Sequence, residues 1–114
     1  MKAALERLST RDREAVDEFR QEMLKNLKSS LVSIKLFGSK ARGDDAPDSD
    51  IDIAVIVKRY SARLENKLID LAFEVNLKYG VYISPFIIAR GTFRHPVWRF
   101  SPFLKNIQTQ GVLL

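Results

Sequence analysis

The sequence contains no cysteine, so it can form neither a disulfide framework nor a thiolate-bound metal centre. This absence fits a reducing compartment, and we expect a cytoplasmic protein. His95 is the only histidine, which argues against a histidine metal cluster or a serine–histidine triad and suits an ordinary loop position. The N-terminal segment is too charged for a signal peptide, and no apolar run could cross a bilayer.

Acidic residues are missing from the C-terminal third of the sequence. Glu74 is the last carboxylate, and the cations that follow it are Lys78, Arg90, Arg94, Arg99 and Lys105. The whole net charge of +5 therefore belongs to this third. It forms either a solvated basic surface or a face that attracts phosphate, nucleic acid or an acidic partner. The aromatic residues among these cations, which either pack in the core or stack on a base or partner, are Phe93, Trp98, Phe100 and Phe103.

What the chain does contain suits one small globular domain over residues 1–114. Hydrophobic residues make up 46% of the sequence, which predicts a packed core rather than disorder. Periodicity and capping residues predict helices over 10–28, 61–79 and 102–110, and strands over 31–37, 51–57, 81–89 and 112–114. Pro85 predicts that the third strand lies at an edge or carries a bulge, and the most apolar strand, 51–57, should be central. The predicted fold is α/β (α+β), with helices packed on one small sheet.

Two aspartates begin the predicted central strand. Asp50 and Asp52 are separated by one residue, so their side chains point to the same face of the sheet. Their alpha carbons should lie about 6.6 Å apart, and both carboxylates can then hold one divalent ion or two. Oxygen ligands of this kind favour Mg²⁺ over zinc.

A Gly38–Ser39 turn ends the strand before this acid pair. Glycine allows the backbone to approach a phosphate closely, and amide groups at a following helix start bind anions. Ser39 adds a hydroxyl donor, while Lys40 and Arg42 add positive charge. The simpler interpretation is a turn followed by a polar strand start. The joined pattern of turn and acid pair instead predicts a site for a Mg²⁺-bound nucleoside triphosphate.

The segment GSKARGDDAPDSDIDIAV, residues 38–55, resembles the signature of the polymerase beta nucleotidyltransferase superfamily. The chain looks most similar to the minimal nucleotidyltransferases, short proteins often paired with a helical HEPN-domain partner. The resemblance implies the polymerase beta-like fold over almost the whole chain. It also implies that Gly38 and Ser39 hold the triphosphate of ATP or another nucleotide, that Asp50 and Asp52 bind Mg²⁺, and that Arg42 lies near the phosphates. In such pairs the nucleotidyltransferase acts as an antitoxin that transfers AMP to a hydroxyl of the HEPN toxin.

One feature departs from the superfamily pattern. Members generally carry a third carboxylate on the following strand, where it helps to bind metal and to deprotonate the acceptor hydroxyl. Here Ser84 occupies the expected position. Three alternatives follow: a base from elsewhere, such as Asp44, Asp45 or a partner residue; weak activity; or a nucleotide-binding antitoxin that acts by complex formation alone. Turn chemistry by itself explains Asp44, Asp45 and Asp48, and nucleic-acid binding rests only on charge.

Overall fold

A computed structural model describes residues 2–44 and 46–114, without the side chains of residues 2–4, 98 and 99. Asp45 and the side chains of Trp98 and Arg99, all singled out from the sequence, therefore lie outside the described part of the molecule. None of the described helices is both long and apolar enough to span a membrane.

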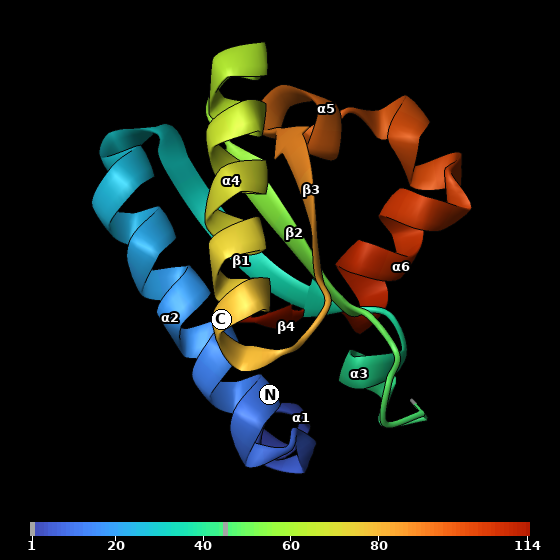
Figure 1. Ribbon diagram of the computed structural model, residues 1–114. Coiled ribbons are helices and arrows are strands. Elements are labelled where there is room, and N and C mark those ends of the chain that lie inside the picture. Colours follow the sequence, from blue (N-terminus) through green and yellow to red (C-terminus); the bar gives the residue numbers. More distant parts are fainter. Residues whose placement is uncertain (1, 45) are drawn as a thin grey trace.

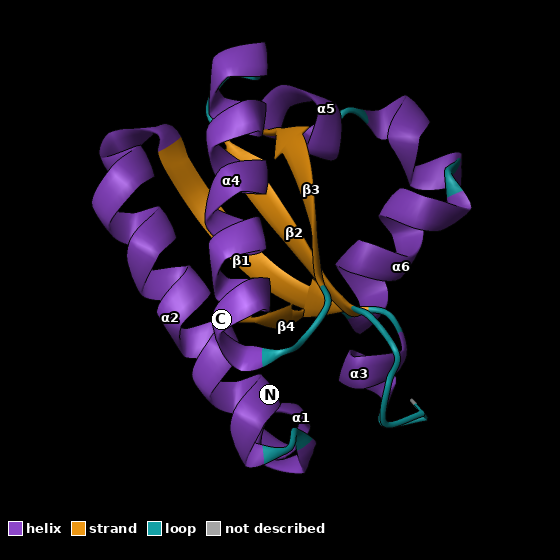
Figure 2. Cartoon of the chain, viewed as in Figure 1, coloured by secondary structure: helices purple, strands orange, loops and turns teal. Residues whose placement is uncertain are grey.

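The chain folds into helices packed on a single mixed sheet (Figures 1 and 2). The elements in chain order are α1 (Lys2–Arg7), α2 (Thr10–Leu27), the 3-10 helix η1 (Lys28–Ser30), β1 (Leu31–Phe37), α3 (Ser39–Arg42), β2 (Ile51–Val57), α4 (Ala62–Tyr79), β3 (Ile83–Ala89), α5 (Arg90–Arg94), the 3-10 helix η2 (Pro96–Phe100), α6 (Pro102–Gln110) and β4 (Val112–Leu113). The strand order is β3-β2-β1-β4. β1 runs antiparallel to β2 and β4, whereas β2 and β3 are parallel and joined by the crossover helix α4.

The long helices begin and end within one residue of the predicted bounds. The Ser9 hydroxyl accepts a hydrogen bond from the Asp12 amide at the start of α2, and the Ser61 hydroxyl accepts one from the Leu64 amide at the start of α4. Such caps satisfy amides that have no partner within the helix. Gly80 ends α4 in the left-handed region with φ 66°, a conformation that glycine adopts without strain.

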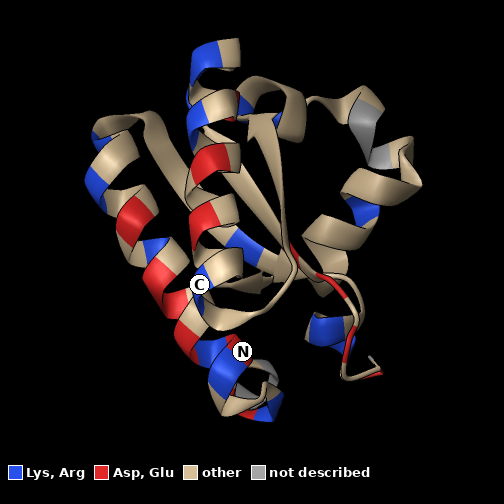
Figure 3. Cartoon of the chain, viewed as in Figure 1, with Lys and Arg blue, Asp and Glu red and all other residues tan. Residues whose placement is uncertain are grey.

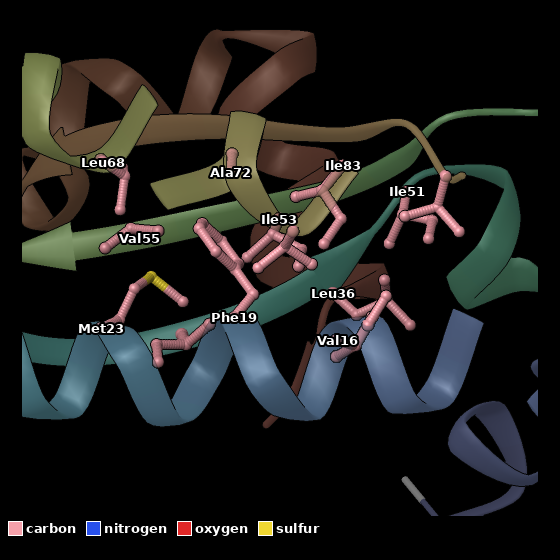
Figure 4. Packing of buried hydrophobic residues seen from close by; sticks show 14 of the residues in the cluster. Val16, Phe19, Met23, Leu36, Ile51, Ile53, Val55, Leu68, Ala72 and Ile83 are labelled. Carbon is pink, nitrogen blue, oxygen red and sulfur yellow. The ribbon is translucent and has the colours of Figure 1, made fainter. Parts of the chain in front are cut away.

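Each face of the sheet covers its own apolar cluster. On one face, α2 and α4 pack on the sheet around Phe19, Leu36, Ile53 and Leu68, a cluster that we call the first core (Figure 4). The smaller cluster on the opposite face, which we call the second core, comprises Phe37, Ala54, Ile56, Ile88, Leu104 and Ile107. Successive residues of β2 alternate between the two, because side chains of a strand point to opposite faces. The central position predicted for this strand is confirmed.

Some boundaries and short elements differ from the prediction. β3 begins at Ile83 rather than at residue 81. The Asn76 side chain of α4 contacts this first residue: its Nδ2 donates to the Ile83 carbonyl, and its Oδ1 accepts from the Ile83 amide. β3 is an edge strand, as Pro85 predicts. The sequence did not predict α1, α5 or the two 3-10 helices.

Candidate active site

The sheet register brings the predicted turn, the acid pair and Ser84 to one place. Asp52 pairs with Phe37 of β1 on one side and with Ser84 of β3 on the other. Gly38 follows Phe37 directly, and Asp50 lies one residue before β2 begins. Asp52 shares its sheet face with Ala54 and thus with the second core. This end of the sheet is therefore the candidate active site.

Gly38 is required by the way the backbone passes Asp52. Its φ is 77°, in the region that other residues rarely adopt. A Cβ built on Gly38 would collide with Oδ2 of Asp52. The turn can lie directly against this carboxylate only because residue 38 has no side chain.

The turn continues into the single helical turn α3. The Gly38 carbonyl accepts hydrogen bonds from the amides of Ala41 and Arg42, each with a donor–acceptor distance of 3.1 Å. Gly43 then ends α3 in the left-handed region. Ser39 occupies the first helical position. The Arg42 side chain is 41% exposed, and its Nε lies 3.2 Å from Oδ2 of Asp44.

Lys40 is placed differently from the prediction. Its ammonium lies 3.0 Å from Oδ2 of Asp12 in α2, and the two side chains are only 4% and 6% exposed. Lys40 Nζ also lies 3.5 Å from the Pro47 carbonyl of the loop before β2. This burial argues against the predicted phosphate contact. Lys40 instead anchors α3 and the loop to the first turn of α2.

A second contact, from the end of α1, also holds α3 in place. Arg7, just before α2, donates a hydrogen bond from its guanidinium to the Ala41 carbonyl at 3.0 Å. A Cβ at Gly43 would approach Nε of Arg7 to 2.7 Å, so this glycine also makes room for the contact. Sequence reasoning missed the supporting roles of Arg7 and Asp12. The contact of Asp12 with Lys40, 28 positions away in the sequence, has no local signal that could have predicted it.

The electrostatics of Asp52 reflect its crowded position. Burial raises the pKa of the Asp52 carboxyl above its ordinary value, and the neighbouring Asp50 carboxylate raises it further. The Arg42 guanidinium acts in the opposite direction and lowers this pKa. Asp52 is thus a half-buried carboxylate that a second carboxylate repels. A bound cation would stabilise its charged form.

The donor set fits Mg²⁺. The two carboxylates supply oxygen ligands only, and Mg²⁺ is commonly held by one or two carboxylates together with substrate phosphates and water. Among the described residues there is no group of three or more acidic, histidine or cysteine side chains that could hold a metal without such help.

The remaining residues weighed from the sequence fall into structural roles or stay at the rim. Ser84 is partly buried and is the direct neighbour of Asp52 in the register. Asp44 and Asp48 are exposed in the loop before β2. His95 is an exposed loop residue whose Nδ1 accepts from the Val97 amide. Phe103 packs edge-on against Phe37, with ring centroids 5.7 Å apart.

A family described as "Nucleotidyltransferase domain" matches residues 16–105, which include the turn, both aspartates and all of β3. The chain belongs to this family. Its class of activity is therefore nucleotidyl transfer, and the resemblance drawn from residues 38–55 is confirmed.

Curated relatives of this nucleotidyltransferase come from Methanocaldococcus jannaschii. "Putative protein adenylyltransferase MJ0141" is 35% identical over 100 residues, covering 87% of this chain and 94% of the relative. "Putative protein adenylyltransferase MJ0604" is 31% identical over 104 residues, covering 90% and 97%.

Solved structures with a similar fold include a "toxin-antitoxin with AMP-PNP" and the "toxin-antitoxin MntA-HpeT". The first has a TM-score of 0.57 and 24% identity, over 83% of this chain and 68% of the other. The second has a TM-score of 0.56 and 22% identity, over 86% and 70%. At this identity the likeness concerns the fold, and it confirms the predicted polymerase beta-like arrangement.

Proposed function

We propose that this nucleotidyltransferase transfers AMP from Mg²⁺-bound ATP to a hydroxyl group of a protein acceptor. The observation that carries the proposal is the close approach of Gly38 to the Asp52 carboxylate, so that the turn proposed to bind phosphate lies beside the acid pair. Two relatives whose names describe protein adenylyltransferases support AMP as the transferred group and a protein as the acceptor. A similar fold in a toxin–antitoxin complex supports an acceptor that is also a binding partner, for which a HEPN-type toxin is the proposed class.

The residues divide the work of binding. Asp50 and Asp52 would hold the metal, and the Gly38–Ser39 turn would hold the distal phosphates through its amides and the Ser39 hydroxyl. Arg42, whose guanidinium already acts on Asp52, would add positive charge where pyrophosphate leaves. Bound Mg²⁺ would supply charge neutralisation at the reacting phosphate. The acceptor oxygen bonds to the α-phosphorus, the bond to pyrophosphate breaks, and the hydroxyl proton passes to a base.

The base is the incomplete part of the site. Ser84 stands beside Asp52 where the superfamily generally has a carboxylate, and a hydroxyl is a poor base near neutral pH. We propose that the isolated protein transfers AMP slowly and that Ser84→Asp speeds transfer to a competent acceptor by about 10²–10⁴-fold, the usual contribution of a general base. The assay is run at saturating Mg²⁺, and circular dichroism verifies the fold. A folded variant no faster than a rapid wild type would place the base elsewhere, at Asp44 or on the partner.

Incubation with ATP labelled at the α-phosphate tests the main proposal. The protein is mixed with Mg²⁺ and a candidate HEPN-type partner, and label on either protein is followed on a denaturing gel. We expect Asp50→Asn plus Asp52→Asn to abolish both labelling and calorimetric Mg²⁺-ATP binding. Glu14→Gln plus Asp17→Asn, which removes two exposed carboxylates of α2, is the matched control and should leave both unchanged. Unaltered ATP affinity in the Asp50 and Asp52 variant would refute the site.

A second candidate function, partner binding without transfer, is favoured by the outer face of α4. Ile69, Phe73 and Leu77 are 50%, 61% and 70% exposed, although large apolar side chains are usually buried. Their spacing of four residues aligns them as one stripe on the helix. Such a stripe suits a protein partner and is independent of Ser84.

Size-exclusion chromatography of the co-expressed pair tests this function. Phe73→Glu plus Leu77→Glu should separate the two proteins, whereas Val97→Glu, at a residue 64% exposed elsewhere, should not. If the wild-type pair eluted together without any label transfer, complex formation alone would be the function.

A further inference from the structure

A basic cavity lies on the same sheet face as Asp52 but farther along the strands. Its volume is about 570 Å³, within the range of small-molecule sites, and it lies between β1, α5 and α6. Its cationic lining residues are Lys35, Arg90 and Arg94. Ile56 forms part of its floor, four residues beyond Asp52 on β2, which corresponds to about 13 Å along the strand. The cavity is therefore separate from the turn and the acid pair.

The fold directs three positive charges into this cavity from two elements. Arg90 and Arg94 are four residues apart in α5, so their side chains lie on the same side of that helix. Lys35 reaches the cavity from β1, and its ammonium lies 5.5 Å from the centroid of the Phe93 ring. The Gln108 side chain of α6 donates a 2.9 Å hydrogen bond to the Phe93 carbonyl. This bond holds α5 against α6 and fixes the wall that carries both arginines.

No carboxylate balances these charges within the described part of the chain. The cavity has no acidic lining residue, and none of the described ion pairs involves Lys35, Arg90 or Arg94. Lys78, another cation of the C-terminal third, is by contrast paired with Glu18 at 2.7 Å. Figure 3 shows the acidic residues along α2 and α4 and before β2, and none on α5 or α6. Three convergent cations repel one another, and a bound anion removes that repulsion.

We propose that this cavity binds a ligand with consecutive phosphate groups, which each of the three cations contacts. Consecutive phosphates match the chemistry because they spread negative charge over a length that cations from both β1 and α5 can contact. Ser33 and Gln108 add neutral polar groups to the lining. A nucleoside polyphosphate and a single-stranded RNA backbone both present such groups. The cavity would thus give the protein a second anion site that requires no metal.

Calorimetric titration with inorganic tripolyphosphate tests the site. EDTA is present throughout, so that binding dependent on Mg²⁺ is silent. We expect wild-type protein to bind, and Arg90→Gln plus Arg94→Gln to weaken binding by about tenfold or more, since bonds to charged groups are lost. Arg63→Gln plus Lys67→Gln removes the same charge from the exposed side of α4 and should change binding less than twofold, an order-of-magnitude expectation for surface charges.

Two further variants separate this site from the candidate active site. Asp50→Asn plus Asp52→Asn should keep tripolyphosphate binding, and the Arg90 and Arg94 variant should keep Mg²⁺-ATP binding. Absence of wild-type binding at millimolar ligand, or equal weakening by the α4 control, would overturn the proposal. Either result leaves the active-site assignment untouched.

The source of the phosphates is decided by repeating the titration with ADP and with a single-stranded RNA oligomer. If RNA is the ligand, its affinity falls with salt, and removal of each arginine lowers the slope of that dependence by about one. If a nucleotide is the ligand, ADP binds at least as tightly as the oligomer. Binding of all three with no difference between wild type and the arginine variant would contradict the site itself.

Discussion

The two faces of the sheet differ in the side chains that they carry. The face toward α2 and α4 is filled with large apolar side chains such as Phe19 and Ile53, both fully buried. The opposite face carries a smaller apolar cluster and places Asp52, Ser84 and Lys35 at its margins. Stability is therefore concentrated on one face, and chemistry on the other. This division lets charged groups accumulate beside β2 without weakening the main core.

The largest effect should come from opening the first core. Phe19→Ala should lower the free energy of unfolding by about 3–5 kcal/mol, because it leaves a cavity where a fully buried ring packed. Phe73→Ala, at a ring 61% exposed on α4, is the matched control and should change it by less than about 0.5 kcal/mol. Urea denaturation measures both. Equal losses would show that the two positions are not distinguished by burial.

Variants of the Lys40–Asp12 pair test the contact between α3, beside the candidate active site, and α2, which packs on the first core. Lys40→Met should lower the free energy of unfolding by about 3 kcal/mol, because it leaves the Asp12 carboxylate buried without its partner. Adding Asp12→Asn should recover part of that loss, as expected for two residues that interact directly. Thermal denaturation measures the cycle. Additive losses would mean that the pair is not coupled. ATP affinity should also fall in the single variant, because α3 loses its anchor.

A smaller effect, on ligand binding at the candidate active site, should come from Ser39. Ser39→Ala should weaken ATP binding by about 1.5–3 kcal/mol through loss of a hydrogen bond to a charged phosphate. AMP binding should weaken less, because the turn faces the distal phosphates in the proposed arrangement. Isothermal titration in Mg²⁺ compares the two ligands, and the melting temperature serves as the control. Equal losses for ATP and AMP would remove Ser39 from the triphosphate site.

The smallest effect should be a dependence of stability on pH at Asp52. Folding raises the pKa of this carboxyl above its value in the unfolded chain. The wild type therefore loses stability as the pH rises from the unfolded-state pKa through the folded-state pKa. Asp52→Asn should therefore raise the melting temperature near neutral pH without metal, and the gain should vanish at pH values below about 4, where the unfolded carboxyl is also protonated. Asp48→Asn, in the exposed loop, is the control. A gain that is constant across pH would contradict the assignment.

The elements governed by local pattern could be predicted from the sequence, while those governed by distant contacts could not. The strands Leu31–Phe37 and Ile51–Val57 have the predicted bounds, because alternation and β-branched residues act locally. The helix α5 contains Gly91 and Thr92, which are poor helix formers, and is held by Gln108 and by packing of Phe93 on the second core. No local pattern encodes those contacts.

The residues of the candidate site also include some whose placement local sequence predicts and one, Lys40, whose placement depends on a distant contact. The placement of Gly38, Asp50 and Asp52 follows from one hairpin, and Ser84 followed once two strands were taken as neighbours. Lys40 could not be assigned correctly because a lysine after a Gly-Ser turn has the same sequence signature whether it meets a phosphate or a buried carboxylate. Only the tertiary contact of Lys40 with Asp12 of α2 distinguishes these roles.

The parallel pairing of β2 and β3 has a consequence for the order in which the site assembles. The turn and the acid pair belong to the antiparallel β1–β2 hairpin, whose loop closes over a short stretch of chain. Ser84 reaches Asp52 only after α4 has crossed the sheet, and such non-local pairing is slow. We therefore expect an early folding species in which Gly38 already lies against Asp52, whereas β3 with Ser84 has not yet joined the sheet. Pulse-labelled hydrogen exchange would then protect amides of β1 and β2 before those of β3, and simultaneous protection would contradict this order.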